Sequence, residues 1–264
     1  MKVYRALTIA GSDSGGGAGI QADLKTFQQL GVYGMSVVTA LTAQNTLGVH
    51  GVMPVPPAFI EQQMDAVLSD IGTDAAKTGM LFDSNIIEMV AKKIKQYEIT
   101  NYVLDPVMIA KGGASLLLEE AVEAVKQYLI PLAMVVTPNL PEAEVLTGIK
   151  IETMDEMKKA AQILREMGAQ SVVIKGGHSS GEMAIDVFYD GQEFKELKEK
   201  RFETPHTHGT GCTFAAAVTA GLARGKSVVE AVDEAKRFIT AAICNPLGIG
   251  HGHGPTNHWA YQRT

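Results

Sequence analysis

The chain has 264 residues, of which 46% are hydrophobic and 20% charged, so it is large enough to bury one extensive core. Its formal net charge of −6 provides no basic face for a nucleic-acid backbone, and we expect no nucleic-acid partner. The two cysteines, Cys212 and Cys244, lack the spacing that is typical of disulfide or zinc frameworks.

We expect neither export nor a membrane partner. The apolar run at 6–10 ends at once in Gly-Ser-Asp-Ser-Gly, which is too short for the core of a signal peptide. The longest stretch of small apolar residues, 214–223, is about half of the ~20 residues that span a bilayer. These features favour a cytoplasmic protein in a reducing compartment.

Along the chain, short apolar runs alternate with segments whose apolar residues recur at helical spacing. Runs that end in Gly, Asp or Pro are typical of buried parallel strands, and the 3.6-residue period is typical of helices. The predicted strands are 6–10, 36–41, 74–80, 101–107, 134–137 and 171–175, and the predicted helices are 20–30, 58–69, 85–97, 119–129 and 154–167.

This alternation predicts an α/β three-layer sandwich, with a mainly parallel central sheet and helices on both faces. Two later strands, 184–189 and 193–197, flank Asp190-Gly191, a two-residue hairpin signal that predicts a small antiparallel hairpin at one edge. Helices from Cys212 to about 223 and from 228 to about 243 complete the body. We find no internal repeat or linker and expect a single domain, 1–264.

In open parallel sheets, ligands bind beyond the carboxyl ends of the strands, so the residues after each predicted strand are candidate site residues. These segments are rich in glycine and polar side chains. They are 11–19, 42–45, 77–80, 105–108, 137–142, 175–178 and 206–212.

The first glycine-rich loop, 11–19, does not match two familiar phosphate motifs. It has no Gly-Lys-Ser/Thr ending, which excludes a Walker A loop. The segment 17–22 fits G-x-G-x-x-A, but no acid ends the second strand to bind a dinucleotide ribose. The glycines alone would permit a tight turn. The unbroken run of polar and glycine residues favours a cradle for a substrate.

The segment Gly209-Thr-Gly-Cys212 directly precedes a predicted helix. Two glycines let several amides point at one position, and a helix N-terminus favours a phosphate or a developing phosphoryl charge. The same position would lower the pKa of Cys212, which favours a thiolate base or nucleophile. The alternative interpretation is a small apolar side chain packed under the helix.

Carboxylates and lysines at strand ends suit a metal-bound nucleotide. Asp105 follows a strand, and Glu142 lies three residues after Asn139 in another such loop, an arrangement that suits Mg²⁺. Glu142 would also stabilise a helix N-terminus. Lys175 ends a strand before two glycines and would face polyphosphate, unless it is a solvated surface lysine; Lys77 is a weaker candidate.

The histidines do not complete a ligand set for a metal at the usual spacing. We interpret them as polar loop residues that line a nucleotide site, or as surface residues. They are His206, His208, His251, His253 and His258.

Four segments together resemble the hydroxymethylpyrimidine/phosphomethylpyrimidine kinase family of the ribokinase-like superfamily. They are GSDSGGGAGIQAD at 11–23, DPVMIAK at 105–111, TPNLPEAE at 137–144 and HTHGTGCT at 206–213. The resemblance covers nearly the whole chain in the right order. It implies a ribokinase-like fold and two successive ATP-dependent phosphorylations, of 4-amino-5-hydroxymethyl-2-methylpyrimidine and then of its monophosphate, for thiamine biosynthesis.

The resemblance also implies roles for individual residues. Cys212 stands where sugar kinases of the superfamily have an aspartate base, and 109–116 matches their mobile flap. Relatives are often dimers, which implies a homodimer. The implied catalytic residues are Cys212, Gly209 and Gly211, the substrate-binding residues Gly11, Asp23, Gln44, Met80 and Val107, the ATP-binding residues Thr137, Lys175, Gly177 and Thr210, and the Mg²⁺ ligands Asp105, Asn139 and Glu142.

Gln44 favours a pyrimidine substrate. Its amide offers one donor and one acceptor in a plane, which fits an amino group beside a ring nitrogen. Pyridoxal lacks that pair, and Ala110 stands where some pyridoxal-using relatives have a second cysteine. Gln44 could instead bond only to backbone. A pyridoxal kinase, a noncatalytic nucleotide-binding protein and a dinucleotide-dependent oxidoreductase stay open as alternatives.

Overall fold

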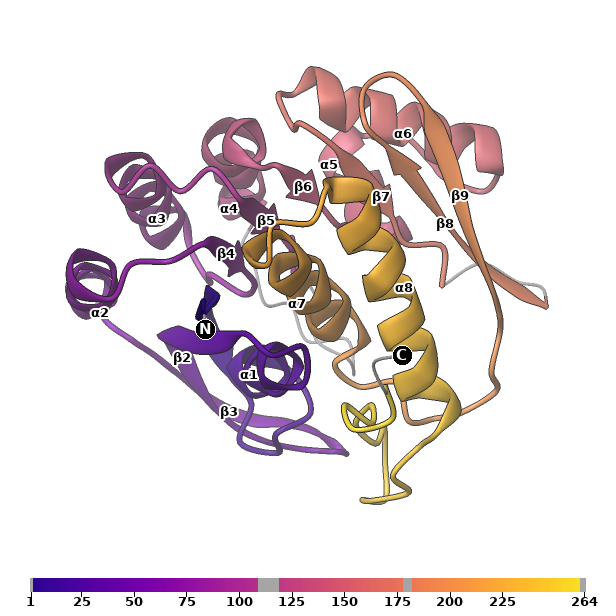
Figure 1. Ribbon diagram of the computed structural model, residues 1–264, viewed down its shortest axis with the longest axis horizontal. Coiled ribbons are helices and arrows are strands. Elements are labelled where there is room, and N and C mark those ends of the chain that lie inside the picture. The colour runs from indigo at the N-terminus through magenta and orange to yellow at the C-terminus, as the bar shows by residue number, and fades with distance from the viewer. Residues whose placement is uncertain (1, 109–118, 178–181, 262–264) are drawn as a thin grey trace.

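The computed structural model describes residues 2–108, 119–177 and 182–261. In this part of the chain, nine strands form one sheet in the order β3-β2-β1-β4-β5-β6-β7-β8-β9 (Figure 1). Six neighbouring strands are parallel and coincide with the six predicted ones, which confirms the mainly parallel sheet. They are β1 (Arg5–Ser12), β2 (Tyr33–Asn45), β4 (Ala75–Thr78), β5 (Tyr102–Leu104), β6 (Val135–Val136) and β7 (Val172–Ile174).

The predicted hairpin forms one edge of the sheet. Strand β8 (Met183–Tyr189) runs antiparallel to β7 and to β9 (Phe194–Lys200). The connection is longer than the predicted two residues, because Tyr189 pairs with Phe194. The carboxylate of Asp190 accepts the amides of Gln192 and Glu193, so this side chain closes a four-residue turn.

The opposite edge carries a strand that the sequence did not predict. β3 (Gly48–Pro54) is antiparallel to the extended end of β2, and most of its residues are exposed. Because neither of its faces is buried, it lacks the apolar pattern from which strands are predicted.

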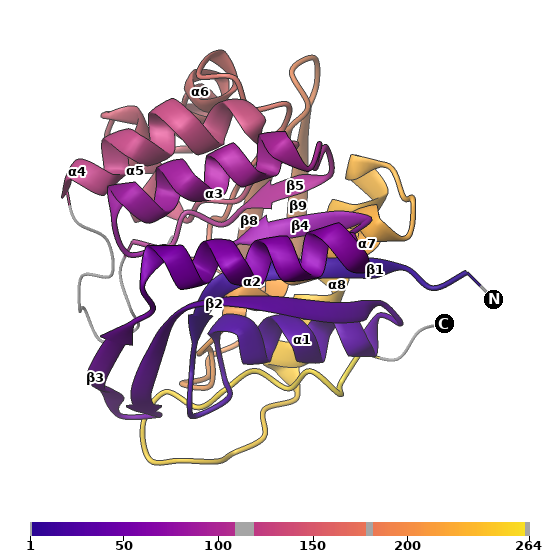
Figure 2. The same cartoon turned by 90° about the vertical axis from the view of Figure 1, so that its left-hand side faces the viewer.

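Helices cover both faces of the sheet, as predicted (Figure 2). Among the described residues, five α-helices lie on one face and three on the other, and each layer packs an apolar core against the sheet. The first face holds α2 (Pro57–Asp70), α3 (Ser84–Gln96), α4 (Glu119–Ala124), α5 (Leu140–Thr147) and α6 (Met154–Glu166), and the second holds α1 (Gly19–Gln29), α7 (Thr210–Ala223) and α8 (Val228–Cys244). The predicted helix 119–129 continues after α4 as a π-helical turn (Val125–Leu129) and a 3-10 turn (Ile130–Leu132).

Helix α7 occupies the middle of its layer, between α1 and α8 (Figure 1). Every residue from Thr213 to Ala223 is buried, and the small side chains of Ala215, Ala216 and Ala217 permit close packing. The N-terminus of α7 is thereby fixed at the carboxyl edge of the parallel strands. No helix in the described ranges has both the length and the apolar character to cross a membrane.

Candidate active site

A cavity of about 430 Å³ lies at the carboxyl edge of the parallel strands, bounded by the loops that follow them and by the start of α7. Thirteen of the fifteen predicted site residues line it. They are Gly11, Gln44, Met80, Asp105, Val107, Asn139, Glu142, Lys175, Gly177, Gly209, Thr210, Gly211 and Cys212. The structure therefore brings these residues to one place, as the strand-end argument predicts.

Two predicted site residues, Asp23 and Thr137, lie outside the cavity lining. Asp23 is fully buried on α1, where its carboxylate accepts hydrogen bonds from Thr8 at 2.6 Å and from Lys77 Nζ at 3.0 Å. Thr137 is also fully buried, 3.3 Å from Asp105 Oδ1. In this structure both side chains support the cavity wall from behind, and the contacts of Asp23 with substrate and of Thr137 with ATP stay predictions. Lys77 is fully buried as well, so it does not face a phosphate.

The glycine-rich loop is organised around Asp13. The carboxylate accepts the amides of Gly15, Gly17 and Ala18 at 2.8, 3.0 and 2.8 Å. These amides therefore point at Asp13, and the predicted substrate cradle is not built from them. Gly19 has φ +55°, and a Cβ there would collide with the carbonyl oxygen of Gly11, so the turn into α1 requires glycine.

The start of α7 rests directly on this loop. Gly209 caps the helix with φ +81°, and a Cβ atom there would collide with the carbonyl oxygen of Gly17. The first amides of a helix have no acceptor within it; the Thr210 amide donates to the carbonyl oxygen of Thr207, and those of Gly211 and Cys212 are available to an anion. A Cβ at Gly211 would lie 3.3 Å from Lys175 Nζ, which shows how closely the helix approaches this cation.

Cys212 lines the cavity in the first turn of α7 and is partly exposed. Burial raises the pKa of its thiol to about 12, although the nearby Lys77 ammonium and the Gly19 amide act to lower it. Asp23 and Asp105 add to the rise. The sequence prediction of a lowered pKa is therefore wrong, because burial and negative neighbours outweigh the helix N-terminus.

Asp105, Lys175 and Glu142 form a charged wall of the cavity. Lys175 Nζ lies 3.0 Å from Asp105 Oδ1, and its pKa is raised because the two carboxylates outweigh its burial. Burial raises the pKa of Glu142 to about 7, against the opposing charge of Lys175. Asp105 Oδ2 is buried without a hydrogen-bond partner among the described residues, which is a position that a cation would satisfy.

The Asn139-x-x-Glu142 motif also has a structural function. Asn139 Oδ1 accepts the Glu142 amide at 2.9 Å, and Glu142 Oε2 accepts the Asn139 amide at 2.9 Å, which forms a capping box at the start of α5. The helix-capping interpretation of Glu142 is thus confirmed. Because the cap engages the Asn139 oxygen, Asp105 Oδ2 and the remaining Glu142 oxygen are the stronger candidates for a metal.

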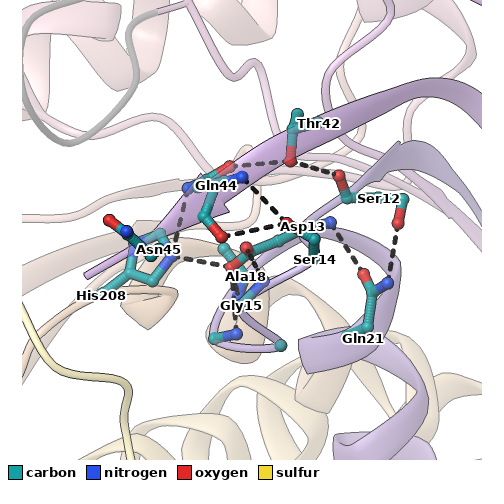
Figure 3. Close-up of polar contacts among 12 residues, drawn as sticks. Ser12, Asp13, Ser14, Gly15, Ala18, Gln21, Thr42, Gln44, Asn45 and His208 are labelled. Atoms are coloured by element: carbon teal, nitrogen blue, oxygen red, sulfur yellow. Dashed lines mark hydrogen bonds and ion pairs between the residues drawn. The ribbon is translucent and has the colours of Figure 1, made fainter. Parts of the chain in front are cut away.

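One of the five candidate histidines lines the cavity. His208 Nε2 lies 2.8 Å from Asp13 Oδ2 and 3.4 Å from the amide of Gln44 (Figure 3). The cavity lining does not include the other four histidines, which fits the alternative interpretation of them as residues outside the site. The role of Asp13 was missed from the sequence, although its place in the glycine-rich loop was visible. The flap 109–116 with Ala110, and His178, lie outside the described residues.

Comparisons with known proteins agree with this geometry. A family model of phosphomethylpyrimidine kinase matches residues 13–257. The chain is 57% identical to hydroxymethylpyrimidine/phosphomethylpyrimidine kinase from Bacillus subtilis, over 100% of this chain and 97% of that one. It is 54% identical to the thiamine biosynthesis bifunctional protein ThiED from Geobacter sulfurreducens, over 96% of this chain and 51% of that one.

Solved structures show the same fold. Pyridoxal kinase from Staphylococcus aureus in complex with AMP-PCP and pyridoxal superposes with a TM-score of 0.93 at 45% identity, covering 100% of this chain and 96% of that one. Pyridoxal kinase from B. subtilis with ADP gives 0.91 at 47%, covering 98% of each chain. The predicted ribokinase-like kinase fold is confirmed. With the match to residues 13–257 and this level of identity, the chain belongs to the phosphomethylpyrimidine kinase family.

Proposed function

We propose that this enzyme transfers a phosphoryl group from MgATP to 4-amino-5-hydroxymethyl-2-methylpyrimidine and then a second one to the monophosphate. The observation that carries the proposal is the composition of one cavity. Gln44, which can pair with an aminopyrimidine edge, lines the same cavity as the α7 N-terminus, Cys212 and Lys175. The names of relatives at 57% and 56% identity, hydroxymethylpyrimidine/phosphomethylpyrimidine kinase, support the same substrate.

In this proposal, the protein acts on the transferring group mainly through electrostatics. The amides of Gly211 and Cys212 in the first turn of α7 and the ammonium of Lys175 stabilise negative charge on the phosphoryl group. Asp105 Oδ2 and Glu142 would hold Mg²⁺, which neutralises ATP phosphates when bound.

Cys212 is the proposed acceptor of the alcohol proton in the first transfer. Only the thiolate can accept this proton, so the thiol, whose pKa burial raises to about 12, first releases its own proton to solvent, and the Lys77 ammonium reduces the cost of that ionisation. The second transfer has a phosphate acceptor with a second pKa near ~6, which is largely anionic at neutral pH. The second step therefore needs no base, and Cys212 matters mainly for the first.

Pyridoxal phosphorylation is the alternative that a specific observation favours, because the superposed S. aureus and B. subtilis structures are pyridoxal kinases. Both substrates present a hydroxymethyl group on a six-membered aromatic ring. They differ at the ring edge, where only the pyrimidine has an amino group beside a ring nitrogen. Selection between them therefore depends on Gln44 and its neighbours.

The test is incubation of the full chain with MgATP and the aminopyrimidine, with mono- and diphosphate detected by mass spectrometry. We expect both products in sequence, and a higher kcat/KM for the aminopyrimidine than for pyridoxal at the same ATP concentration. A higher kcat/KM for pyridoxal would replace the proposal with the alternative. Binding of ATP without either product would point to a noncatalytic nucleotide-binding protein.

We further propose that the chain acts as one cytoplasmic kinase domain within a homodimer. The exposed edge strand β3 and the exposed side chains of Leu47, Val52 and Met53 support a surface that associates with a second copy. Light scattering of the purified chain should give the mass of a dimer, and the mass of one chain would contradict this.

A further inference from the structure

The cavity end that holds Gln44 contains a hydrogen-bond network whose donors and acceptors can be assigned. The first fixed member is Asp13, whose Oδ2 already accepts the amides of Gly17 and Ala18. Burial acts to raise the pKa of Asp13. The hydrogen bonds and charge of His208 and the loop amides act to lower it and outweigh burial, so the pKa lies below its usual value. Asp13 is therefore an ionised carboxylate that only accepts hydrogen bonds.

The carboxylate in turn fixes the proton on His208. His208 Nε2 lies 2.8 Å from Asp13 Oδ2, and an unprotonated Nε2 would set its lone pair against the carboxylate at that distance. Nε2 must carry a hydrogen and donate it to Asp13. Nε2 therefore has no lone pair with which to accept a hydrogen bond from Gln44.

Thr42 fixes the other side of Gln44. Its hydroxyl lies 2.9 Å from the carbonyl oxygen of Ser12, which can only accept, so the single hydroxyl hydrogen goes there. The second polar neighbour of this hydroxyl is the Gln44 amide, at 3.2 Å. Towards Gln44, Thr42 Oγ1 is therefore an acceptor.

Only one amide orientation satisfies both neighbours. Figure 3 draws the Gln44 nitrogen towards His208, an arrangement in which two donors face each other. The oxygen and nitrogen of a side-chain amide are distinguished by their partners, and here the partners place the oxygen towards His208 and the nitrogen towards Thr42. The one N–H of His208 Nε2 is then shared between Asp13 at 2.8 Å and the Gln44 oxygen at 3.4 Å, and one N–H and one oxygen lone pair of Gln44 remain for a ligand.

We propose that Asp13 and His208 are positioning residues that fix the orientation of the Gln44 amide and thereby select an aminopyrimidine in one pose. This inference rests on the proposed function. The pyrimidine amino group donates to the Gln44 oxygen on the His208 side, and the ring nitrogen accepts from the Thr42 side. The hydroxymethyl carbon, which adjoins the amino-bearing carbon on the other side, is then directed towards Gly209 and the start of α7.

The kinetic test compares two replacements of His208 of similar length. His208→Gln can place an N–H near the position of Nε2, whereas His208→Met cannot. We expect His208→Met to lower the ratio of kcat/KM for the aminopyrimidine to kcat/KM for pyridoxal by about tenfold, and His208→Gln to restore most of that ratio. His253→Met, an exposed change on the adjoining tail, is the matched control.

A double variant separates positioning from general damage. If His208 acts through the amide, His208→Met should lower the ratio no further when Gln44 is already alanine. An equal fall in both backgrounds, or an equal fall for both substrates, would overturn the proposal. The proposal would also be overturned if His208→Gln lowered the ratio of kcat/KM for the aminopyrimidine to kcat/KM for pyridoxal as much as His208→Met does.

The proton on His208 can be tested without any substrate. ¹⁵N NMR of the imidazole in the wild-type chain should show Nε2 protonated at neutral pH, and an unprotonated Nε2 would overturn the proposal even if both phosphorylated products form. Conversely, a protonated Nε2 in an enzyme that makes no product from the aminopyrimidine would overturn the proposed function. This measurement also covers the case in which the His208 variants fail to fold.

Discussion

Two lysine–aspartate pairs with the same 3.0 Å contact have opposite relations to the cavity. Lys77 and Asp23 are fully sealed, with side-chain exposures of 0% each, whereas Lys175 and Asp105 are 14% and 2% exposed and line the cavity. Each aspartate keeps one buried oxygen without a partner among the described residues. The same chemistry thus supports the frame in one place and faces the ligand in the other, and access to the cavity makes the difference.

Cys212 lies where the two pairs meet, since its pKa responds to Lys77, Asp23 and Asp105. Replacing Cys212 with alanine should produce the largest effect on the reaction. We expect the first phosphorylation to slow by about 10²- to 10⁴-fold, the usual contribution of a positioned base, and the second to slow far less. Single-turnover rates for the alcohol and for the monophosphate measure the two steps separately, and equal losses would remove the base assignment.

Breaking the sealed pair should mainly affect folding. Lys77→Met leaves the Asp23 carboxylate buried and unpaired, so the free energy of unfolding should fall by about 3–5 kcal/mol. Urea unfolding measures this change. Combining Lys77→Met with Asp23→Asn removes the buried charge and should recover much of the loss. A double variant as unstable as the single one would show that the cost is not electrostatic.

The same substitution in the open pair should affect catalysis more than folding. Lys175→Met removes a cation from the cavity wall but leaves Asp105 near the solvent-accessible cavity, so the loss of stability should be smaller than for Lys77→Met. We expect kcat/KM for ATP to fall by about 10²-fold, comparable with the loss of one donor to a developing anion. If Lys175→Met unfolds the chain while Lys77→Met is stable and impaired with ATP, the assignment of the two pairs is reversed.

The difference between the two pairs also marks what sequence could predict. Parallel strands were recognisable because they are buried on both faces, and thirteen of the candidate site residues line one cavity, as the strand-end rule predicts. The exposed strand β3 carried no such pattern. The contact of Asp23 with Lys77 joins residues 54 positions apart, and the sealing of that contact depends on the packing of α1 and α7 over the sheet.

The prediction of a lowered pKa for Cys212 was wrong for a related physical reason. A helix N-terminus is a local feature and can be read from Gly209-Thr-Gly-Cys212. Burial and the charges of Asp23 and Asp105 come from distant segments, and in this chain they outweigh the helix. The contacts of His208 could not be predicted from its local sequence either, since its partners Asp13 and Gln44 lie 195 and 164 positions away.

A third sealed group sharpens the comparison, because no carboxylate among the described residues forms an ion pair with it. His258 is buried beside Thr213, with Nε2 3.0 Å from the threonine hydroxyl, and burial together with the charge of Lys25 lowers its pKa from 6.5 to about 4. Between these two values the unfolded chain binds the proton and the folded chain does not, so acid favours unfolding.

From pH 7 to pH 5, His258 should therefore lower the free energy of unfolding by about 2 kcal/mol, the smallest of these effects. Urea unfolding of the wild type and of His258→Gln at both pH values isolates the contribution, because glutamine does not titrate. The wild type should lose about 2 kcal/mol more than the variant over this interval, while Lys77, with Asp23 beside it, stays charged throughout. Equal losses in the two proteins would mean that His258 is protonated in the folded state, and that a buried cation here does not require a carboxylate partner.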